Sequence, residues 1–133
     1  MEPLAVGMSR EEIREVALYY GSLSVPQATP STPTSELAIT RGATIAREGI
    51  PSARVPICSQ CHGPGDDQRN PVYPTLAGQY ADYLMLQLQL MAGNRRGGSD
   101  FAALMHPIAD RLTEEQMRDV GLYYESLTAP PTR

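Results

Sequence analysis

The stretch Cys58-Ser59-Gln60-Cys61-His62 contains both cysteines of this 133-residue chain. Two thiols separated by two residues and followed directly by a histidine are typical of covalent c-type haem attachment. One helical turn presents both sulfurs to the two vinyl groups of a porphyrin, and the next residue places its imidazole beneath the iron. The stretch therefore predicts one haem c bonded to Cys58 and Cys61, with His62 as the proximal axial ligand.

Two other kinds of chemistry use the same residue types. A thioredoxin-type redox pair stands between a strand and a helix, whereas a proline-containing loop precedes Cys58 and a Gly- and Pro-rich stretch follows His62. A structural zinc ion needs further Cys or His ligands, and His106 is the only other histidine. Haem attachment is the favoured interpretation.

The second axial ligand must come from later in the chain, where four methionines follow the motif: Met85, Met91, Met105 and Met117. Met85 and Met91 lie in an amphipathic segment, where methionine usually fills the core, and Met117 lies inside the expected final helix. Met105 precedes Pro107 in a stretch that we expect to be a loop, from which a side chain can reach a metal. Because His/Met ligation is known in cytochromes c, the sequence favours Met105, with His106 as the competing ligand.

Composition and charge exclude several classes of partner. One Phe and no Trp predict a small core, which a large apolar prosthetic group would complete. The net charge of −4 and the lack of lysine argue against nucleic acid and anionic membranes. No stretch approaches roughly 18 consecutive apolar residues, so we expect no membrane attachment through this segment. Residues 1–7 lack a secretion signal, as a mature or truncated chain also would.

Local signals indicate an all-α chain. The Pro-, Ser- and Thr-rich stretch 24–34 is expected to be a linker. Behind it, Thr34 or Ser35 can cap a helix that runs to about Glu48. Residues 79–91 fit a helix or a strand, and their length and lack of β-branched residues favour a helix. Thr113 and Gln116 form a capping-box pattern at the start of a final helix.

An internal repeat relates residues 1–23 to residues 105–127. Aligning Met1 with Met105 gives eleven identities in 23 positions without gaps, among them both adjacent tyrosine pairs, Tyr19-Tyr20 and Tyr123-Tyr124. Helix periodicity explains shared apolar spacing but not identities at solvent-facing positions. We therefore expect residues 1–23 to be the end of an earlier copy of the same domain.

Three motifs in this order resemble those of the class I cytochromes c, most closely a domain of the diheme cytochrome c4 group. They are Cys58–His62, the stretch YPTLAGQY at 73–80 and the stretch MHPIA at 105–109. The match covers about 36–127. It implies a small all-α class I cytochrome c fold around one covalent haem, with an extra N-terminal helix. It also implies that 79–91 is a helix and that the helix with Gly42 crosses the final helix near its two tyrosines.

The resemblance further implies roles for residues around the haem. The carbonyl of Pro71, in preference to that of Pro64, would accept the Nδ1 proton of His62. The residues expected near the propionates are Tyr73, Gln79 and Arg95 or Arg96. The alternatives to these propionate roles are that Tyr73 is an ordinary core residue and that the arginines are solvent-exposed charges in a loop.

A diheme protein carries two attachment motifs, whereas this chain has one. The repeat offers a reason, since Met1 aligns with Met105. We expect 1–23 to be the C-terminal remnant of a preceding cytochrome c domain, 24–34 a linker and 35–133 a monohaem cytochrome c domain. A truncated chain or an internal start in a protein of at least two domains would give this arrangement. The apolar stripe of the 8–23 helix would then dock on the haem domain or on a second chain as a homodimer.

The expected function is one-electron transfer, as a carrier or as one domain of a multihaem relay. Two axial ligands leave no open iron position, so we expect no enzyme activity at the haem. Redox proteins are the expected partners, meeting a small apolar patch edged by arginine. The expected location is the periplasm or another extracytoplasmic space. The alternatives are an electron-accepting domain or subunit of a larger oxidoreductase, and a sensor in which a small ligand displaces Met105.

Overall fold

The computed structural model describes residues 5–23, 35–64, 72–97 and 100–128, without the side chains of 100–102. The described residues divide into two units, and the first contains α2 (Arg10–Ser22). The second unit contains α3 (Glu36–Glu48), the 3-10 turn η1 (Pro51–Ala53), α4 (Ser59–His62), α5 (Ala81–Ala92), α6 (Asp100–Ala109) and α7 (Glu114–Ser126). One isolated β-bridge joins Ile50 and Val55, and no strand occurs in the described parts of the chain. The all-α prediction is confirmed, whereas the expected linker 24–34 lies outside the described residues.

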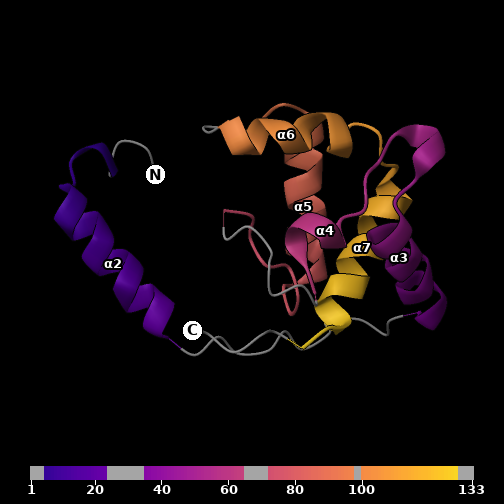
Figure 1. The fold of residues 1–133 in the computed structure, drawn as a ribbon, viewed down its shortest axis with the longest axis horizontal. Coiled ribbons are helices and arrows are strands. Elements are labelled where there is room, and N and C mark those ends of the chain that lie inside the picture. The colour runs from indigo at the N-terminus through magenta and orange to yellow at the C-terminus, as the bar shows by residue number, and fades with distance from the viewer. Residues whose placement is uncertain (1–4, 24–34, 65–71, 98–99, 129–133) are drawn as a thin grey trace. The chain divides into compact units, whose positions relative to one another are not determined.

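The second unit is organised around α7, which lies between α3 and α5 (Figure 1). Two glycines allow these close approaches. A Cβ atom on Gly42 of α3 would lie 2.0 Å from the carbonyl oxygen of Asp119, and one on Gly121 of α7 would lie 2.9 Å from that of Ala81. No side chain larger than hydrogen fits at Gly42 without moving a helix. The predicted crossing of the Gly42 helix over the final helix is therefore confirmed.

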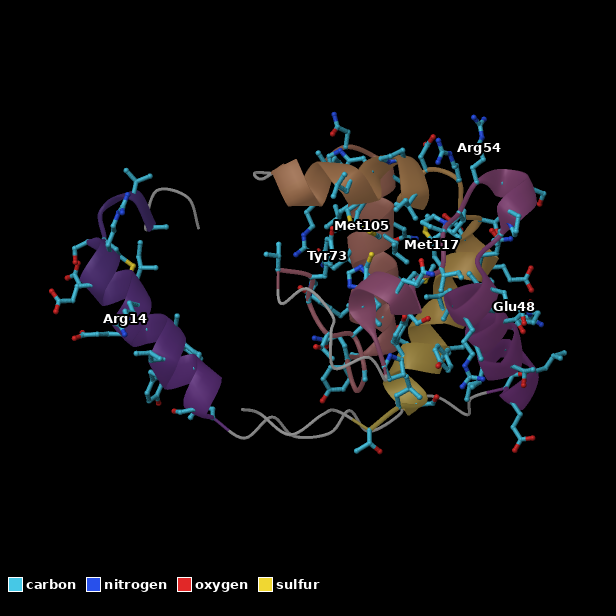
Figure 2. The ribbon with its side chains drawn as sticks, in the orientation of Figure 1. Arg14, Glu48, Arg54, Tyr73, Met105 and Met117 are labelled. Atoms are coloured by element: carbon cyan, nitrogen blue, oxygen red, sulfur yellow. The ribbon has the colours of Figure 1, made fainter. Side chains whose placement is uncertain are left out.

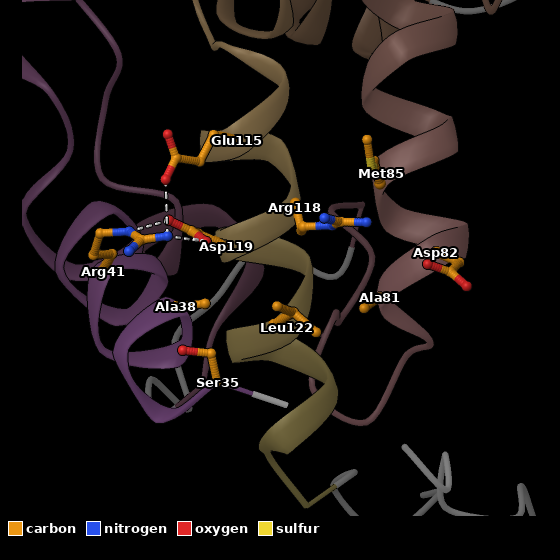
Figure 3. A pocket seen from close by; sticks show the side chains of 10 residues that line it. All are labelled: Ser35, Ala38, Arg41, Ala81, Asp82, Met85, Glu115, Arg118, Asp119 and Leu122. Atoms are coloured by element: carbon orange, nitrogen blue, oxygen red, sulfur yellow. Dashed lines mark hydrogen bonds and ion pairs between the residues drawn. The ribbon is translucent and has the colours of Figure 1, made fainter. Parts of the chain in front are cut away.

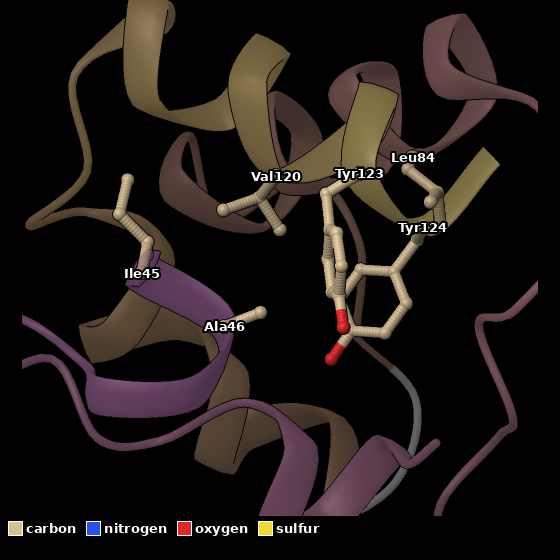
Figure 4. Close-up of a cluster of buried hydrophobic side chains, with 6 residues drawn as sticks. All are labelled: Ile45, Ala46, Leu84, Val120, Tyr123 and Tyr124. Atoms are coloured by element: carbon tan, nitrogen blue, oxygen red, sulfur yellow. The ribbon is translucent and has the colours of Figure 1, made fainter. Parts of the chain in front are cut away.

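The main core fills the space between these three helices. Its buried side chains are Ile45, Ala46, Leu84, Val120, Tyr123 and Tyr124 (Figure 4). A second cluster, formed by Val55, Leu112 and Met117, includes Met85 at its edge. Met117 is thus a core residue of α7, and Met85 packs against the core, as the sequence predicted for Met85.

Local sequence signals account for most helix ends. α3 follows Ser35 and ends at Gly49, whose φ of 70° suits glycine. α7 begins with the predicted capping box, in which the Thr113 hydroxyl accepts from the Gln116 N–H and the Gln116 side chain accepts from the Thr113 N–H. The ambiguous segment 79–91 is a helix, α5, with slightly later bounds.

The expected loop around Met105 is wrong, because Met105 lies inside α6. This helix crosses α5 (Figure 1). Pro107 has no N–H for a helical hydrogen bond, yet the backbone continues past it, and the Asp110 N–H donates to the His106 carbonyl at 3.0 Å. The fixed φ of proline is compatible with a helix, so one missing bond near the end of a short helix is tolerated here.

The first unit is one amphipathic helix with its own capping box. The Ser9 hydroxyl accepts from the Glu12 N–H, and the Glu12 carboxylate accepts from the Ser9 N–H. α2 and α7 both have 13 residues, and their caps stand at the positions that the repeat pairs. The apolar side chains of α2 are exposed, with Ile13 at 47% and Tyr20 at 67%. Across the described ranges, no helix is long and apolar enough to cross a membrane.

Candidate functional site

Cys58 and Cys61 lie on the single helical turn of α4. Cys58 has helical backbone angles, and its carbonyl accepts from the N–H groups of Cys61 and His62 at 3.2 Å and 2.9 Å. Both thiols are free of disulfides and half-buried. Gly63, with φ of 73°, ends the turn directly after His62. The turn therefore presents two thiols and one imidazole within a single short element.

His62 is buried, and a backbone carbonyl holds its ring. Its Nδ1 lies 2.8 Å from the carbonyl oxygen of Pro74. An Nδ1–H that donates to this oxygen places the imidazole lone pair on Nε2, the nitrogen that a metal would take. The predicted acceptor was Pro71, which lies outside the described residues, and the structure gives this bond to Pro74 instead. Pro74 belongs to the stretch 73–80 that carried the resemblance.

Burial of the Cys58 thiol affects its reactivity. Burial raises the pKa of the Cys58 thiol, whereas cysteines that act as redox nucleophiles have a lowered pKa. Within the described ranges, no three His, Cys, Asp or Glu side chains are grouped so that they could hold a metal ion. The raised pKa of Cys58 is unlike that of the reactive thiol in a thioredoxin-type pair. The two thiols and the Nδ1-bonded imidazole fit the attachment of haem c.

The other predicted haem neighbours are only partly brought together. Tyr73 lies beside His62, with ring centroids 6.2 Å apart. The Gln79 side chain accepts from the Tyr80 N–H at 2.9 Å, and the Arg95 side chain is exposed and lies near Gly93. Arg96 donates to the Gln87 side chain. Roles at the propionates stay predictions for these residues.

Met105 and its competitor His106 have different surroundings. Met105 is half-buried on α6 (Figure 2). The Nε2 of His106 is hydrogen-bonded to the backbone carbonyl of Arg96. If Nε2 of His106 donates to this carbonyl, the lone pair lies on Nδ1, so the choice between Met105 and His106 as the axial ligand stays a prediction.

Two residues at the end of α7 hold the backbone around this site. The Tyr124 hydroxyl donates to the Gly63 carbonyl at 3.0 Å. The Glu125 carboxylate accepts from the Ala81 N–H at 3.0 Å and caps α5, whose own N-cap residue provides no side-chain bond. Neither contact was predicted from the sequence. A buried Glu and Tyr in the last turn of an amphipathic helix could have signalled them.

A groove of about 560 Å³ lies across α3, α5 and α7 and is separate from the three motif residues Cys58, Cys61 and His62 (Figure 3). Its wall contains Arg41 of α3, which binds Asp119 of α7. The side chains of Ala38, Ala81 and Leu122 form part of its apolar lining. The groove thus belongs to the helix packing and not to the candidate site.

Comparison with known proteins gives relatives of one kind, although no family model matches. The chain is 33% identical to the cytochrome c4 of Thiocapsa roseopersicina over 96% of this chain and 65% of that protein. It is 30% identical to a thiosulfate dehydrogenase electron acceptor of Thiomonas intermedia over 100% of this chain and 60% of that protein. Identity to the cytochrome c-554(548) of Halomonas halodenitrificans is 39% over 55% of this chain and 87% of that protein.

Solved structures agree with these relatives. The cytochrome c4 of Acidithiobacillus ferrooxidans has a TM-score of 0.75 and 31% identity, covering 96% of this chain and 70% of that chain. A thiosulfate dehydrogenase from Marichromatium purpuratum has a TM-score of 0.76 and 35% identity, covering 96% of this chain and 27% of that chain. The chain spans between 52% and 65% of the length of the first three relatives. With its fold, motif and relatives in agreement, the chain belongs to the cytochrome c4 family of class I cytochromes c, and its cofactor is covalently bound haem c.

Proposed function

We propose that this chain transfers single electrons through a haem c bonded to Cys58 and Cys61, with His62 and Met105 as axial ligands. One observation carries the proposal: α4 presents two half-buried thiols on one turn, followed by a buried imidazole whose Nδ1 is bonded to a carbonyl. Haem c, when bound, supplies a one-electron iron couple. The protein supplies the attachment, the axial ligands and their orientation.

Each ligand has a definite part. The Pro74 carbonyl accepts the Nδ1 proton of His62, which makes the imidazole more basic and fixes the plane of its ring. The Met105 thioether raises the reduction potential. With His62 and Met105 both bound to the haem iron, no position would be left for a substrate. The chain therefore acts as an electron-transfer protein and not as an enzyme.

The chain works in the periplasm, with redox proteins as donor and acceptor. Two points support this location. Covalent haem attachment takes place outside the bacterial cytoplasm, and the relatives of this chain are cytochrome c4 proteins. Electron-transfer partners meet through small, short-lived interfaces. Because the chain has no lysine, the partner would meet apolar side chains edged by arginine.

A second candidate function is that of an electron-accepting domain in a larger oxidoreductase. A relative named as a thiosulfate dehydrogenase electron acceptor and the solved thiosulfate dehydrogenase, of which this chain matches 27%, support it. Mixing the haem-loaded protein with thiosulfate and a thiosulfate dehydrogenase tests this role. Rapid reduction that requires the enzyme would support it, and no reduction would leave the carrier role.

We also propose that residues 1–23 are the C-terminal part of a preceding cytochrome domain. The repeat pairs Ala17 of α2 with Gly121 of α7, and Gly21 with Glu125. An alanine in the place of Gly121 would put its Cβ 2.9 Å from the Ala81 carbonyl oxygen. A glycine in the place of Glu125 has no carboxylate to accept from the Ala81 N–H, so it cannot cap α5. α2 is therefore unsuited to the position of α7 in this domain and needs a different partner.

Light scattering combined with amide hydrogen exchange tests this partner. The exposed stripe of α2 should be covered, either by the haem domain or by the equivalent helix of a second chain in a homodimer. A monomer in which residues 8–23 exchange freely would contradict both arrangements. A gene sequence without an in-frame upstream attachment motif would contradict the preceding cytochrome domain.

Optical spectra test the main proposal. The protein should be expressed together with the periplasmic haem-attachment machinery, and one sample should be denatured to separate non-covalent haem. We expect the denatured wild type to keep its haem with a c-type reduced spectrum, and the native oxidised wild type to show a weak far-red sulfur-to-iron band. Cys58→Ala and Cys61→Ala should each lose one thioether, which shifts the reduced band of the haem.

The matched control is Ser59→Ala, which changes α4 between the two cysteines and keeps both thiols. It should retain the wild-type spectrum. A wild-type chain that binds no haem under these conditions would overturn the proposal. A c-type spectrum without the far-red band would keep the haem but remove Met105.

A further inference from the structure

The backbone directly after His62 is held by a residue far away in sequence. The Tyr124 hydroxyl donates to the Gly63 carbonyl at 3.0 Å, across 61 positions of the chain, and the bond is buried. Gly63 is the C-cap of α4, so its peptide follows the last helical residue, His62. Fixing this carbonyl fixes the end of the turn from which the imidazole projects.

The same residue also holds the loop that binds the imidazole ring. The Gly78 N–H donates to the backbone carbonyl of Tyr124 at 2.9 Å. Gly78 lies four residues after Pro74, whose carbonyl oxygen is 2.8 Å from Nδ1 of His62. The loop is held again at its end, where Ala81 donates to Glu125, the neighbour of Tyr124.

We propose that Tyr124 is a positioning residue for His62: its hydroxyl holds the backbone of α4 while its carbonyl holds the loop that carries the Pro74 acceptor. Both supports of the imidazole, its backbone and its Nδ1 partner, then depend on one point of α7. This inference rests on the proposed role of His62 as an axial ligand. It concerns how firmly, and in which orientation, that ligand is held.

The environment of Tyr124 suits a permanent hydrogen-bond donor. Its side chain is fully buried, and its ring contacts that of Tyr123 at a centroid distance of 5.2 Å (Figure 4). Burial raises the pKa of the Tyr124 hydroxyl well above its usual range, so the proton stays in place at working pH. A rigid ring in a packed core transmits the position of α7 to the Gly63 carbonyl.

Tyr123 provides a matched control. It is the adjacent tyrosine and is also buried, at 3% exposure. Its ring lies under Arg47 of α3, at 5.5 Å from the guanidinium carbon, and its hydroxyl has no hydrogen-bond partner in the described structure. Tyr123→Phe therefore removes a buried hydroxyl without touching the supports of His62.

The test compares the reduction potentials of haem-loaded wild type, Tyr124→Phe and Tyr123→Phe. A loosened Nδ1 bond makes the imidazole a weaker electron donor, so oxidised iron is less stabilised and the potential of Tyr124→Phe should rise. We expect a two- to threefold change in the ratio of reduced to oxidised protein at a fixed potential. At 59 mV per tenfold for one electron this is about 20–30 mV. Tyr123→Phe should match the wild type.

Hydrogen exchange gives a second measurement that does not depend on the variants folding. In the wild type, the Nδ1 proton of His62 and the amide proton of Gly78 should be protected by the same opening reaction. An Nδ1 proton that exchanges through a separate, easier opening would overturn the inference. Equal potentials of Tyr124→Phe and Tyr123→Phe would also overturn it. If the wild type carries no haem on His62, the proposed function itself fails, which distinguishes the two outcomes.

Discussion

Arg41 on α3 donates two hydrogen bonds to the carboxylate of Asp119 on α7, from Nε to Oδ2 at 2.6 Å and from Nη2 to Oδ1 at 3.0 Å (Figure 3). The Asp119 side chain is 3% exposed, whereas that of Arg41 is 42% exposed. The same guanidinium lies 3.0 Å from Glu115, whose side chain is 73% exposed. Two carboxylates one turn apart on α7 thus share one arginine but differ in burial. Their difference gives a direct test of which one joins the helices.

Asp119→Asn should lower the free energy of unfolding by about 1–3 kcal/mol, because it weakens hydrogen bonds between a buried carboxylate and a cation. Glu115→Gln changes the same kind of contact at an exposed position, where ion pairs contribute little, and should leave stability nearly unchanged. Denaturant unfolding of the haem-loaded protein measures both variants. Equal losses from the two variants would show that burial does not control this contact.

Gly42→Ala should destabilise the haem domain by about 1–3 kcal/mol or more, because overpacking forces helices apart. The new Cβ would lie 2.0 Å from the Asp119 carbonyl oxygen, so α3 or α7 must shift. Gly21→Ala is the same chemical change in a helix where nothing lies within 4 Å of the added atom. That control should be neutral or slightly stabilising, since alanine favours helix. Thermal unfolding of Gly42→Ala at the wild-type midpoint would refute the close crossing.

Features that depend on neighbouring residues were predictable from the sequence. The capping boxes of α2 and α7 each join residues three positions apart, and the helix stop at Gly49 depends on one residue with a positive φ. The motif at 58–62 is equally local, since one turn contains all its reacting groups. Such signals need no knowledge of the path that the chain takes between them.

Contacts between distant segments were not predictable in the same way. The Pro74 carbonyl reaches His62 across twelve positions, and sequence spacing alone could not distinguish it from Pro71. The bonds from Tyr124 to Gly63 and from Ala81 to Glu125 cross 61 and 44 positions. Pro107 favours a loop over α6 at the level of sequence, although proline near the end of a helix costs only one backbone bond.

Met105→Leu should remove the far-red band of the oxidised protein and lower its reduction potential, because the thioether ligand raises the potential. Met85→Leu is the matched control, since Met85 packs at the edge of the second core cluster and a Leu of similar volume keeps that packing. Visible spectra and a redox titration measure both variants. A far-red band that survives in Met105→Leu would exclude Met105 as the ligand.

The raised pKa of Tyr124 predicts a specific loss of stability in alkali. Burial favours the protonated phenol in the folded state, so this contribution is complete below pH about 10, the ordinary pKa, and is lost as pH rises towards the folded pKa. Within that window the unfolded chain releases a proton that the folded protein keeps. The free energy of unfolding should therefore fall more steeply in the wild type than in Tyr124→Phe, by up to about 1.4 kcal/mol per pH unit.

Denaturant unfolding between pH about 8 and 11 measures this slope, with Tyr83→Phe as the control for loss of a phenol, since Tyr83 is 45% exposed. Identical slopes in the wild type and Tyr124→Phe would mean that Tyr124 is not buried as a donor to Gly63.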